Sequence, residues 1–264
     1  MTKRQNYIIM KKIQIYEKET PMKNKYGIQM YSVRDLTEKD LRSALQQVSE
    51  LGYKYIEFAG FFGHSAEDVA AMLKEFGLEV SGTHSSYNDL RPENLAATIE
   101  YHKTLGNRNF IIPGADLSTL DKIKDFCEIV NYAQPILEKE GIRLSYHNHS
   151  GEFVVGSWGS TIHSELELRT NMDFELDTYW LYNAGVDPIE TMERLSHRLH
   201  IIHLKDGLMG GHGKALGEGT APVAAVREKA LEMGLTIVVE SETLTPDGIS
   251  EVGRCIAYLK ALEA

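Results

Sequence analysis

Short apolar runs alternate with amphipathic segments along most of the chain. The runs predict eight strands, near residues 26–31, 55–58, 78–83, 110–112, the start of 142–152, 174–176, 199–204 and 235–239. The amphipathic segments predict helices near residues 36–51, 66–76, 93–105, 117–140, 161–169, 187–197, 223–233 and 246–262. Glycines such as Gly52, Gly77 and Gly106 stand where helices should end. A strand followed by a helix, repeated along the whole chain, is typical of an α/β protein folded as a closed (β/α)8 TIM barrel.

The barrel is expected to be a single domain spanning residues 26–264, because no linker rich in Pro, Gly or Ser divides it. Residues 1–25 carry several lysines around a short apolar segment, Tyr7 to Met10. A secretory signal needs about 7–15 apolar residues, so this segment predicts a disordered extension rather than a leader. Met22 lies just before the first strand and is a candidate for the native start.

Composition and charge narrow the classes of partner. The 264 residues are 42% hydrophobic and 25% charged, as in ordinary globular proteins. The net charge of -10 gives no electrostatic support for binding nucleic acid or an anionic membrane, and no apolar run approaches the roughly 20 residues of a membrane span. The two cysteines, Cys127 and Cys255, fall in helical patterns and predict buried thiols, which favours a cytoplasmic location.

Metal-competent side chains follow four successive apolar runs. Ile142, Leu144 and Tyr146 lead to two histidines, and the three later runs end in Asp177, His203 and Glu240. The carboxyl ends of barrel strands converge, so these side chains should meet although they lie far apart in sequence. Imidazoles with carboxylates suit one divalent ion such as Mn²⁺, Co²⁺, Zn²⁺ or Fe²⁺ better than Ca²⁺. A pair of ordinary surface histidines is the alternative interpretation of the first cluster.

A cation with open coordination positions could hold a hydroxy-ketone and polarise its carbonyl. A nearby carboxylate or imidazole could then remove the adjacent C–H proton, leaving an enediolate that the cation stabilises. Return of the proton to carbon gives an isomerase or epimerase. Loss of a leaving group gives a lyase or dehydratase.

Several short motifs give the chain a family resemblance over roughly residues 26–262. It resembles the xylose isomerase-like barrels, which are grouped with sugar phosphate isomerases/epimerases and endonuclease IV-type repair enzymes (AP endonuclease family 2). The motifs are Gly-Ile-Gln-Met-Tyr-Ser at 27–32, Tyr-His-Asn-His at 146–149, Leu-Asp-Thr at 176–178, Ile-His-Leu-Lys-Asp at 202–206, Leu-Gly-Glu-Gly at 216–219 and Val-Val-Glu at 238–240. The resemblance implies metal ligands at His147, Asp177, His203 and Glu240, with His149 as an alternative to His147.

Two positions depart from the ketose epimerases of this family. Those enzymes usually have a glutamate where this chain has His147, and tend to have a histidine where it has Trp180. The paired-glutamate epimerase mechanism is therefore incomplete, with only Glu240 remaining. The double histidine looks more like inosose dehydratases and lyases acting on 3-keto-glycosides. The repair enzymes are disfavoured by the net charge.

The candidate catalytic residues are Glu240, His149, Glu152 and Lys205. Glu240 would supply one acid/base role, and His149 or Glu152 the other. Glu152 could equally be a solvated loop carboxylate. Lys205 could hold a substrate oxygen or phosphate, or form an ion pair with Asp206 or another carboxylate.

The candidate substrate-binding residues are His84, Tyr31, Trp180, Glu57 and Phe61. His84 ends the third strand and should face the same mouth. Tyr31, Trp180 and Phe61 could wall a sugar pocket, with core packing as the alternative. Glu57 could accept a hydrogen bond from a ligating side chain or be a barrel-interior carboxylate.

The function expected from the sequence is that of a metal-dependent sugar or sugar-phosphate isomerase/epimerase, with a keto-sugar or inosose lyase/dehydratase as the main alternative. A non-catalytic sugar-binding homologue is a third interpretation. The expected ligand is a sugar, keto-sugar or cyclitol, and a homo-oligomer is compatible with the sequence.

Overall fold

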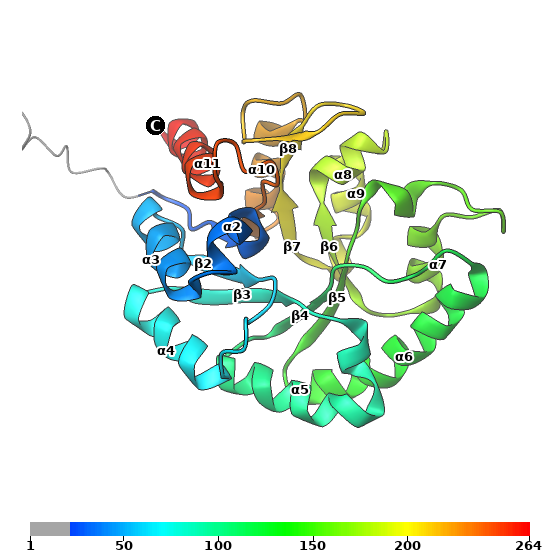
Figure 1. The fold of residues 1–264 in the computed structure, drawn as a ribbon. Coiled ribbons are helices and arrows are strands. Elements are labelled where there is room, and N and C mark those ends of the chain that lie inside the picture. Colours follow the sequence, from blue (N-terminus) through cyan, green and yellow to red (C-terminus); the bar gives the residue numbers. More distant parts are fainter. Residues whose placement is uncertain (1–21) are drawn as a thin grey trace, which may run out of the picture.

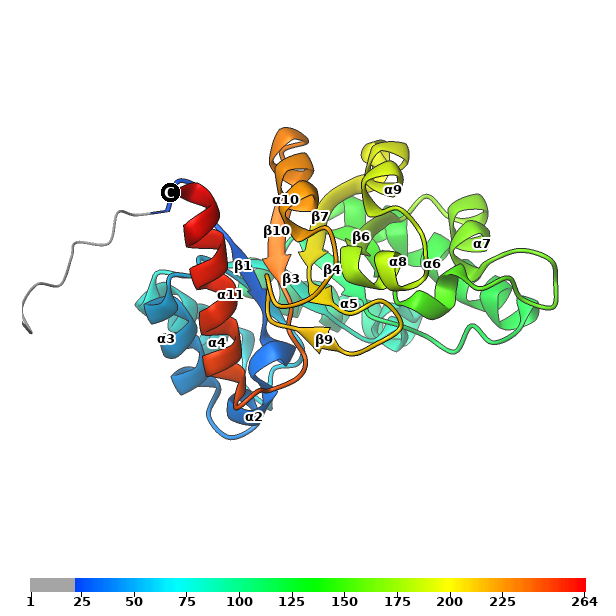
Figure 2. The same cartoon turned by 90° about the horizontal axis from the view of Figure 1, so that it is seen from above.

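In the computed structural model, which describes residues 22–264, parallel strands close into a ring with helices around it (Figures 1 and 2). The strands are β1 (Gly27–Gln29), β2 (Tyr55–Phe58), β3 (Glu79–His84), β4 (Asn109–Ile112), β5 (Arg143–His147), β6 (Asp173–Asp177), β7 (Leu199–Leu204) and β10 (Thr236–Val239). Around the ring the order is β1-β10-β7-β6-β5-β4-β3-β2, and each neighbouring pair is parallel. The expected single (β/α)8 TIM barrel is confirmed.

Helices return the chain from the carboxyl end of each strand to the amino end of the next and cover the outside of the barrel (Figure 1). Local capping sets many of their bounds: Ser65 accepts from the backbone N–H of Asp68 at the start of α4, and Gly77 ends it at a φ of 64°. The helices are α2 (Arg34–Thr37), α3 (Leu41–Leu51), α4 (Ala66–Phe76), α5 (Pro92–Leu105), α6 (Leu120–Lys139), α7 (Ile162–Arg169), α8 (Thr178–Asn183), α9 (Pro188–Arg194), α10 (Val223–Glu232) and α11 (Gly248–Glu263).

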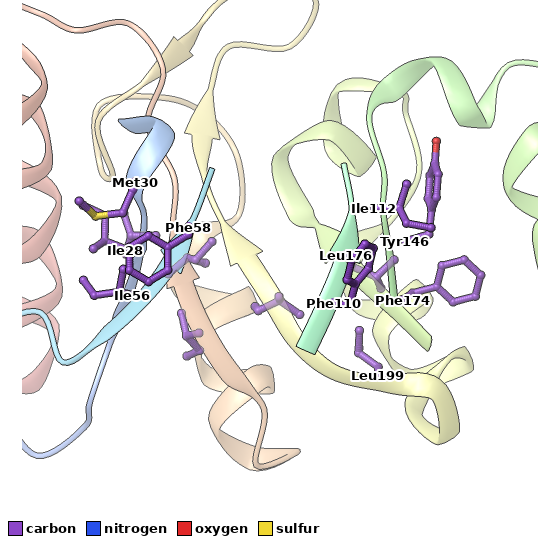
Figure 3. Close-up of a cluster of buried hydrophobic side chains, with 14 of the residues drawn as sticks. Ile28, Met30, Ile56, Phe58, Phe110, Ile112, Tyr146, Phe174, Leu176 and Leu199 are labelled. Atoms are coloured by element: carbon purple, nitrogen blue, oxygen red, sulfur yellow. The ribbon is translucent and has the colours of Figure 1, made fainter. Parts of the chain in front are cut away.

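The main hydrophobic core lies between the strands and the surrounding helices. Successive strand residues point to opposite sides, so every second residue faces outward into this shell. Ile28 and Ile56 are partners across β1 and β2, and Figure 3 shows them beside Phe58. On the other side of the barrel the shell includes Phe110, Ile112, Tyr146, Phe174, Leu176 and Leu199 (Figure 3).

The inward side chains change character along the barrel axis. Along β7 and β10 the inward residues Ile201 and Val238 are apolar, and the next inward residues toward the carboxyl ends, His203 and Glu240, are ionisable. Gly82 has no Cβ and so leaves room for the side chains of Ile111 and Glu57 inside the barrel. A Cβ at that position would lie 2.6 Å from Cδ1 of Ile111 and 3.1 Å from Oε2 of Glu57. The barrel interior is therefore apolar toward the amino ends of these strands and ionisable toward their carboxyl ends. The carboxyl end is where TIM-barrel enzymes carry their active sites.

Most predicted elements are found within a few residues of their expected bounds, but two differ in kind. The helix expected over 36–51 is broken into α2 and α3, because Asp40 accepts from the N–H of Ser43 at 2.9 Å and starts a new helix. Helix α8 was not expected. It begins directly after β6, where Oδ1 of Asp177 accepts from the N–H of Trp180 at 2.9 Å.

The two ends of the described chain lie side by side (Figure 2). The backbone N–H of Lys23 and the amide of Asn24 donate to the carboxylate of Glu263 at 2.7 and 2.8 Å. The extension expected over residues 1–25 lies outside the described residues except for its last four. Cys127 and Cys255 are free and buried, as expected. Within residues 22–264, none of the helices has both the length and the apolar character needed to cross a membrane.

Candidate metal centre and active site

Side chains at the carboxyl ends of β5, β6, β7 and β10 converge at one end of the barrel. The strand register places Asp177 beside His203. One nitrogen or oxygen from each of His147, Asp177, His203 and Glu240 lies within 4.8 Å of the others, and all four residues are buried. The structure thus brings together the four residues that the sequence suggested as metal ligands.

The chemistry of this cluster suits a divalent transition metal. Two imidazoles and two carboxylates form a mixed nitrogen and oxygen donor set. Oδ2 of Asp177 is buried and has no hydrogen-bond partner among the described residues, an unfavourable state that a cation would relieve. Burial lowers the pKa of His147 well below its usual range, and the neighbouring His203 and His84 add to this. A neutral imidazole is the form that binds metals.

A buried lysine balances part of the negative charge at the cluster. Nζ of Lys205 lies 2.9 Å from Glu242, 3.1 Å from Glu240 and 3.8 Å from Asp177. It also sits 4.6 Å from the centre of the Trp180 ring. Burial opposes a charge on Lys205, but these carboxylates outweigh burial and raise its pKa. Burial also opposes a charge on Glu240 and would raise its pKa, but Lys205 and His203 hold the pKa of Glu240 well below its usual range.

More ionisable side chains lie on the far side of the two histidines. Glu57 on β2 and Glu175 on β6 are fully buried. Nε2 of His84 lies 3.1 Å from Oε1 of Glu57 and 2.8 Å from Oε2 of Glu175. These contacts create a second set of four groups within 4.8 Å of one another: His84, His147, Glu175 and His203.

Burial and crowding of charge shift several pKa values in these two layers. Burial raises the pKa of Glu175 to about 8, and the adjacent Glu57 carboxylate adds to the rise. Burial also raises the pKa of Asp177, to about 6, against the pull of Lys205. Burial disfavours a charged His84, but Glu57 and Glu175 outweigh it and raise the pKa of His84 to about 9. Groups with strongly shifted pKa values, gathered at one end of the barrel, are typical of an active site.

His149 extends from the turn after β5, and its side chain is 45% exposed. Glu152 holds this turn, because its Oε2 accepts from the N–H of His149 at 3.0 Å while its Oε1 accepts from the hydroxyl of Tyr146 at 3.0 Å. Burial opposes a charged His149, yet Glu152 outweighs it and raises the pKa of His149. His149 is therefore the more accessible acid/base group, and Glu152 supports it from behind.

A cavity of about 320 Å³ opens above the metal-ligand cluster, a size suited to a small ligand. Its lining residues are Tyr31, Ala59, His84, Pro113, His147, His149, Glu240 and Glu242.

The other sequence candidates stand back from this cavity. Lys205 and Glu57 are buried and are not among its lining residues. Trp180 lies beside Lys205 and His149, with its ring centre 4.6 Å from Nζ of Lys205 and 5.9 Å from the ring centre of His149. The ring of Phe61 packs against Phe58 and Tyr101, at 5.4 and 4.6 Å between centroids, so it is in the position of a packing residue.

Larger hollows lie elsewhere, and two of them have about twice the volume of this cavity. One of about 690 Å³ is lined by residues such as Glu79 and Asn109 at the amino ends of strands, the end associated with stability rather than catalysis. The other, of about 620 Å³, lies between α7 and α9 and is open to solvent. The smaller cavity is the one that combines concavity with converging ionisable groups.

The sequence candidates did not include Ala59, Pro113 and Glu242, which line the cavity, or Gln29 and Glu175, which lie behind its histidines. Gln29 and Glu175 stand inside the apolar runs expected over 26–31 and 174–176 and not at the ends of those runs. The alternation of strand residues was an available signal for Glu175, because it precedes Asp177 by two positions and so faces the same side. No pattern marked Glu242, which reaches Lys205 from the loop after β10.

Solved structures with similar folds come from enzymes described as isomerases, epimerases and dehydratases. A sugar phosphate isomerase/epimerase from Parabacteroides distasonis is 26% identical, with a TM-score of 0.75, 95% of this chain and 98% of that chain covered. A D-allulose 3-epimerase from Methylomonas sp. is 15% identical, with a TM-score of 0.64, 92% of this chain and 99% of that chain covered, which is a likeness of fold alone.

Among curated relatives, the inosose dehydratase of Geobacillus kaustophilus is 23% identical over an alignment of 186 residues that covers 61% of this chain. The match spans 60% of the length of that relative. A family model described as xylose isomerase-like TIM barrel matches residues 45–261. The chain belongs to the xylose isomerase-like TIM-barrel family, as its motifs and strand ends indicated.

Proposed function

We propose that this protein is a divalent-metal-dependent enzyme that moves a proton beside the carbonyl of a sugar, keto-sugar or cyclitol. Its overall reaction would be an isomerisation or epimerisation. The observation that carries the proposal is the cluster of His147, Asp177, His203 and Glu240 at the floor of a small cavity at the catalytic end of the barrel. The sugar phosphate isomerase/epimerase relative, similar over nearly its full length, supports the same reaction class.

A bound divalent cation would polarise the carbonyl and stabilise the negative charge that develops on its oxygen. The protein supplies the other requirements. His147, Asp177, His203 and Glu240 would hold the cation, and Lys205 keeps Glu240 ionised. Tyr31 and Pro113 on the cavity wall would pack against the C–H faces of a sugar ring.

Glu240 and His149 are suited to exchange the substrate proton. Both line the cavity, and they reach it from β10 and β5, which have β7 and β6 between them in the ring. They would therefore approach a bound ring from different sides. An epimerase needs this arrangement, because one group removes the proton and the other returns one.

A lyase or dehydratase is the second candidate. The histidine at the end of β5 and the inosose dehydratase relative favour it. Such a reaction needs one base and assistance to a departing oxygen, so a single carboxylate base would suffice.

The test combines a binding screen with product analysis. Metal-stripped protein is reloaded with Mn²⁺ or Co²⁺ and screened by thermal shift against ketoses, cyclitols and 3-keto-glucosides. Stabilising ligands are then incubated with the enzyme in D₂O. Deuterium incorporated beside the carbonyl of an isomer, with composition unchanged, is the expected NMR result. Loss of water or of an aglycone would establish the lyase, whereas binding without turnover would make the protein a sugar-binding homologue.

The Glu240→Gln variant should lower kcat by about 10²–10⁴-fold, because it removes a proton-transfer group. Exposed Glu218, which pairs with Arg254 on the surface, offers a matched control, and Glu218→Gln should keep wild-type kcat. Full activity in Glu240→Gln would refute its role in both candidate reactions.

A further inference from the structure

Each histidine of the proposed metal site has a ring nitrogen at hydrogen-bond distance from a buried glutamate, and His203 makes contacts through both of its nitrogens. Nδ1 of His203 lies 3.2 Å from Oε2 of Glu240, while its Nε2 lies 2.6 Å from Oε1 of Glu57. Nδ1 of His147 lies 3.1 Å from Oε2 of Glu175. Each imidazole therefore has one nitrogen against a buried carboxylate, on the side away from the proposed ligand cluster.

The two carboxylates are themselves held in place. Gln29 donates to Oε1 of Glu57 at 2.7 Å. His84 bridges the pair, with its Nε2 3.1 Å from Glu57 and 2.8 Å from Glu175. Both glutamates have a relative exposure of 0%, so their positions are set by the protein and not by solvent.

Metal-binding histidines commonly donate their second N–H to a carboxylate, which fixes the ring tautomer and raises the basicity of the other nitrogen. We propose that Glu57 and Glu175 are positioning residues of this kind, so that His203 presents Nδ1 and His147 presents Nε2 to a divalent cation. This inference rests on the proposed metal site. It assigns Glu57 and Glu175 to the support of metal ligands and not to contact with substrate.

A cation bound among His84, His147, Glu175 and His203 is the competing interpretation, because these four groups also lie within 4.8 Å of one another. With both sites filled, His147 and His203 would each have to bridge two cations as an imidazolate. The histidine nitrogens that would bind this second cation are Nε2 of His84, Nδ1 of His147 and Nε2 of His203. Each already lies at hydrogen-bond distance from Glu57 or Glu175. These contacts favour protons, not a metal, between the histidines and the two glutamates.

The test measures Co²⁺ binding directly. Glu57→Gln and Glu175→Gln each replace the carboxyl group that faces a histidine nitrogen with an amide while keeping the shape of the side chain. We expect each variant to bind Co²⁺ about 10–100-fold more weakly than wild type, with an altered Co²⁺ absorption spectrum. Wild type should bind one Co²⁺ per chain. Glu165→Gln is the matched control, because Glu165 is also largely buried but pairs with Arg169 on α7, and it should bind Co²⁺ as wild type does.

Further variants keep the inference testable if a glutamine variant does not fold. Glu57→Asp retains the charge and should bind Co²⁺ more tightly than Glu57→Ala. Affinities in all Glu57 and Glu175 variants within twofold of wild type would overturn the positioning role alone. Two Co²⁺ per chain, one of them lost in Glu175→Gln, would overturn the positioning role in favour of a cation bound among His84, His147, Glu175 and His203. Wild-type protein that binds no Co²⁺, Mn²⁺ or Zn²⁺ would overturn the proposed function as well.

Discussion

Lys205 occupies a demanding position, because its ammonium group is buried and in contact with Glu240, Glu242 and Asp177. A buried charge is tolerated where partners of opposite sign surround it. Removing the lysine would leave several carboxylates close together in a site of low polarity. The residue is therefore as important for the stability of the site as for any chemistry in it.

Replacing this lysine should be costly. The Lys205→Met variant should lose about 3–5 kcal/mol of unfolding free energy in urea titrations, and added Mn²⁺ should restore part of it by replacing the lost positive charge. Lys103 meets Glu140 at 2.7 Å on the surface with half of its side chain exposed, so Lys103→Met should change stability by about 0.5 kcal/mol or less. A Lys205→Met variant as stable as this control would contradict the account.

A second buried residue makes stability depend on pH. His102 is 3% exposed, and its Nδ1 lies 2.9 Å from the amide nitrogen of Asn107, which can only donate. Burial lowers the pKa of His102 to about 4. Between that value and the ordinary pKa of about 6.5, the unfolded chain binds a proton that the folded chain does not.

The contribution of His102 is therefore complete above about pH 6.5 and is lost as the pH falls toward 4. It amounts to about 3 kcal/mol at most. The free energy of unfolding should fall more steeply between pH 7 and pH 4.5 in wild type than in His102→Gln. Parallel pH profiles for the two proteins would show that His102 is not the titrating group.

Among the elements, the long connection after β7 has a single organising residue. The carboxylate of Asp206 accepts from the backbone N–H groups of Gly207, Gly217, Gly219 and Ala221, at 2.8–3.2 Å. A Cβ on Gly219 would lie 2.2 Å from Oδ1 of Asp206, so this glycine is required for the close approach. These contacts join two motifs that are separate in the sequence, His-Leu-Lys-Asp and Leu-Gly-Glu-Gly. They also keep Lys205, the neighbour of Asp206, in place under the cavity.

Asp206→Asn should loosen this connection, because an amide offers one acceptor oxygen in place of two. Hydrogen bonds to a charged group are worth about 1.5–3 kcal/mol each, and we expect a loss of about 2–3 kcal/mol in unfolding free energy. Hydrogen exchange at residues 207–221 should accelerate in the same variant. Glu218 lies between the two glycines but pairs with Arg254 at the surface, so Glu218→Gln provides the comparison and should behave as wild type. Unchanged exchange in Asp206→Asn would argue against the clamp.

The charge of the whole molecule bears on the substrate. The net charge is -10, and the described residues that line the cavity include Glu240 and Glu242 but no arginine or lysine. Lys205 lies below them with its ammonium group already engaged by carboxylates. His84 and His149 also line the cavity, but each is already paired with a carboxylate, His84 with Glu57 and Glu175 and His149 with Glu152. A phosphate dianion would therefore meet the unneutralised charge of the acidic side chains, which costs binding energy.

An unphosphorylated ligand should therefore bind more tightly than its phosphate ester. For whichever ketose or cyclitol stabilises the metal-loaded protein, we expect the ester to bind at least about tenfold more weakly, since 1.4 kcal/mol of repulsion suffices. Calorimetry on the matched pair measures the difference, which should shrink as salt is added. Tighter binding of the ester would contradict this account of the cavity.

The barrel was predictable because its pattern repeats, and each repeat is short enough to be recognised from apolar spacing. The proposed ligands were predictable because Asp177, His203 and Glu240 each interrupt an apolar run. Glu175 and Gln29 were missed because a polar residue inside a strand reads as its exposed face until the barrel closes around it. Helix α8 was missed because Asp177 both ends a strand and caps a helix, a dual role that strand spacing does not reveal.

The arrangement of the proposed metal site can be tested most directly by anomalous X-ray diffraction from crystals grown with Mn²⁺ or Co²⁺. We expect one strong anomalous peak bonded at about 2.0–2.3 Å to His147, Asp177, His203 and Glu240, with Nδ1 of His203 and Nε2 of His147 facing it. Glu57 and Glu175 should remain hydrogen-bonded to the opposite nitrogens. A peak among His84, Glu175, Nδ1 of His147 and Nε2 of His203 would contradict the proposed metal site. The absence of any peak at the carboxyl ends of the strands would also contradict it.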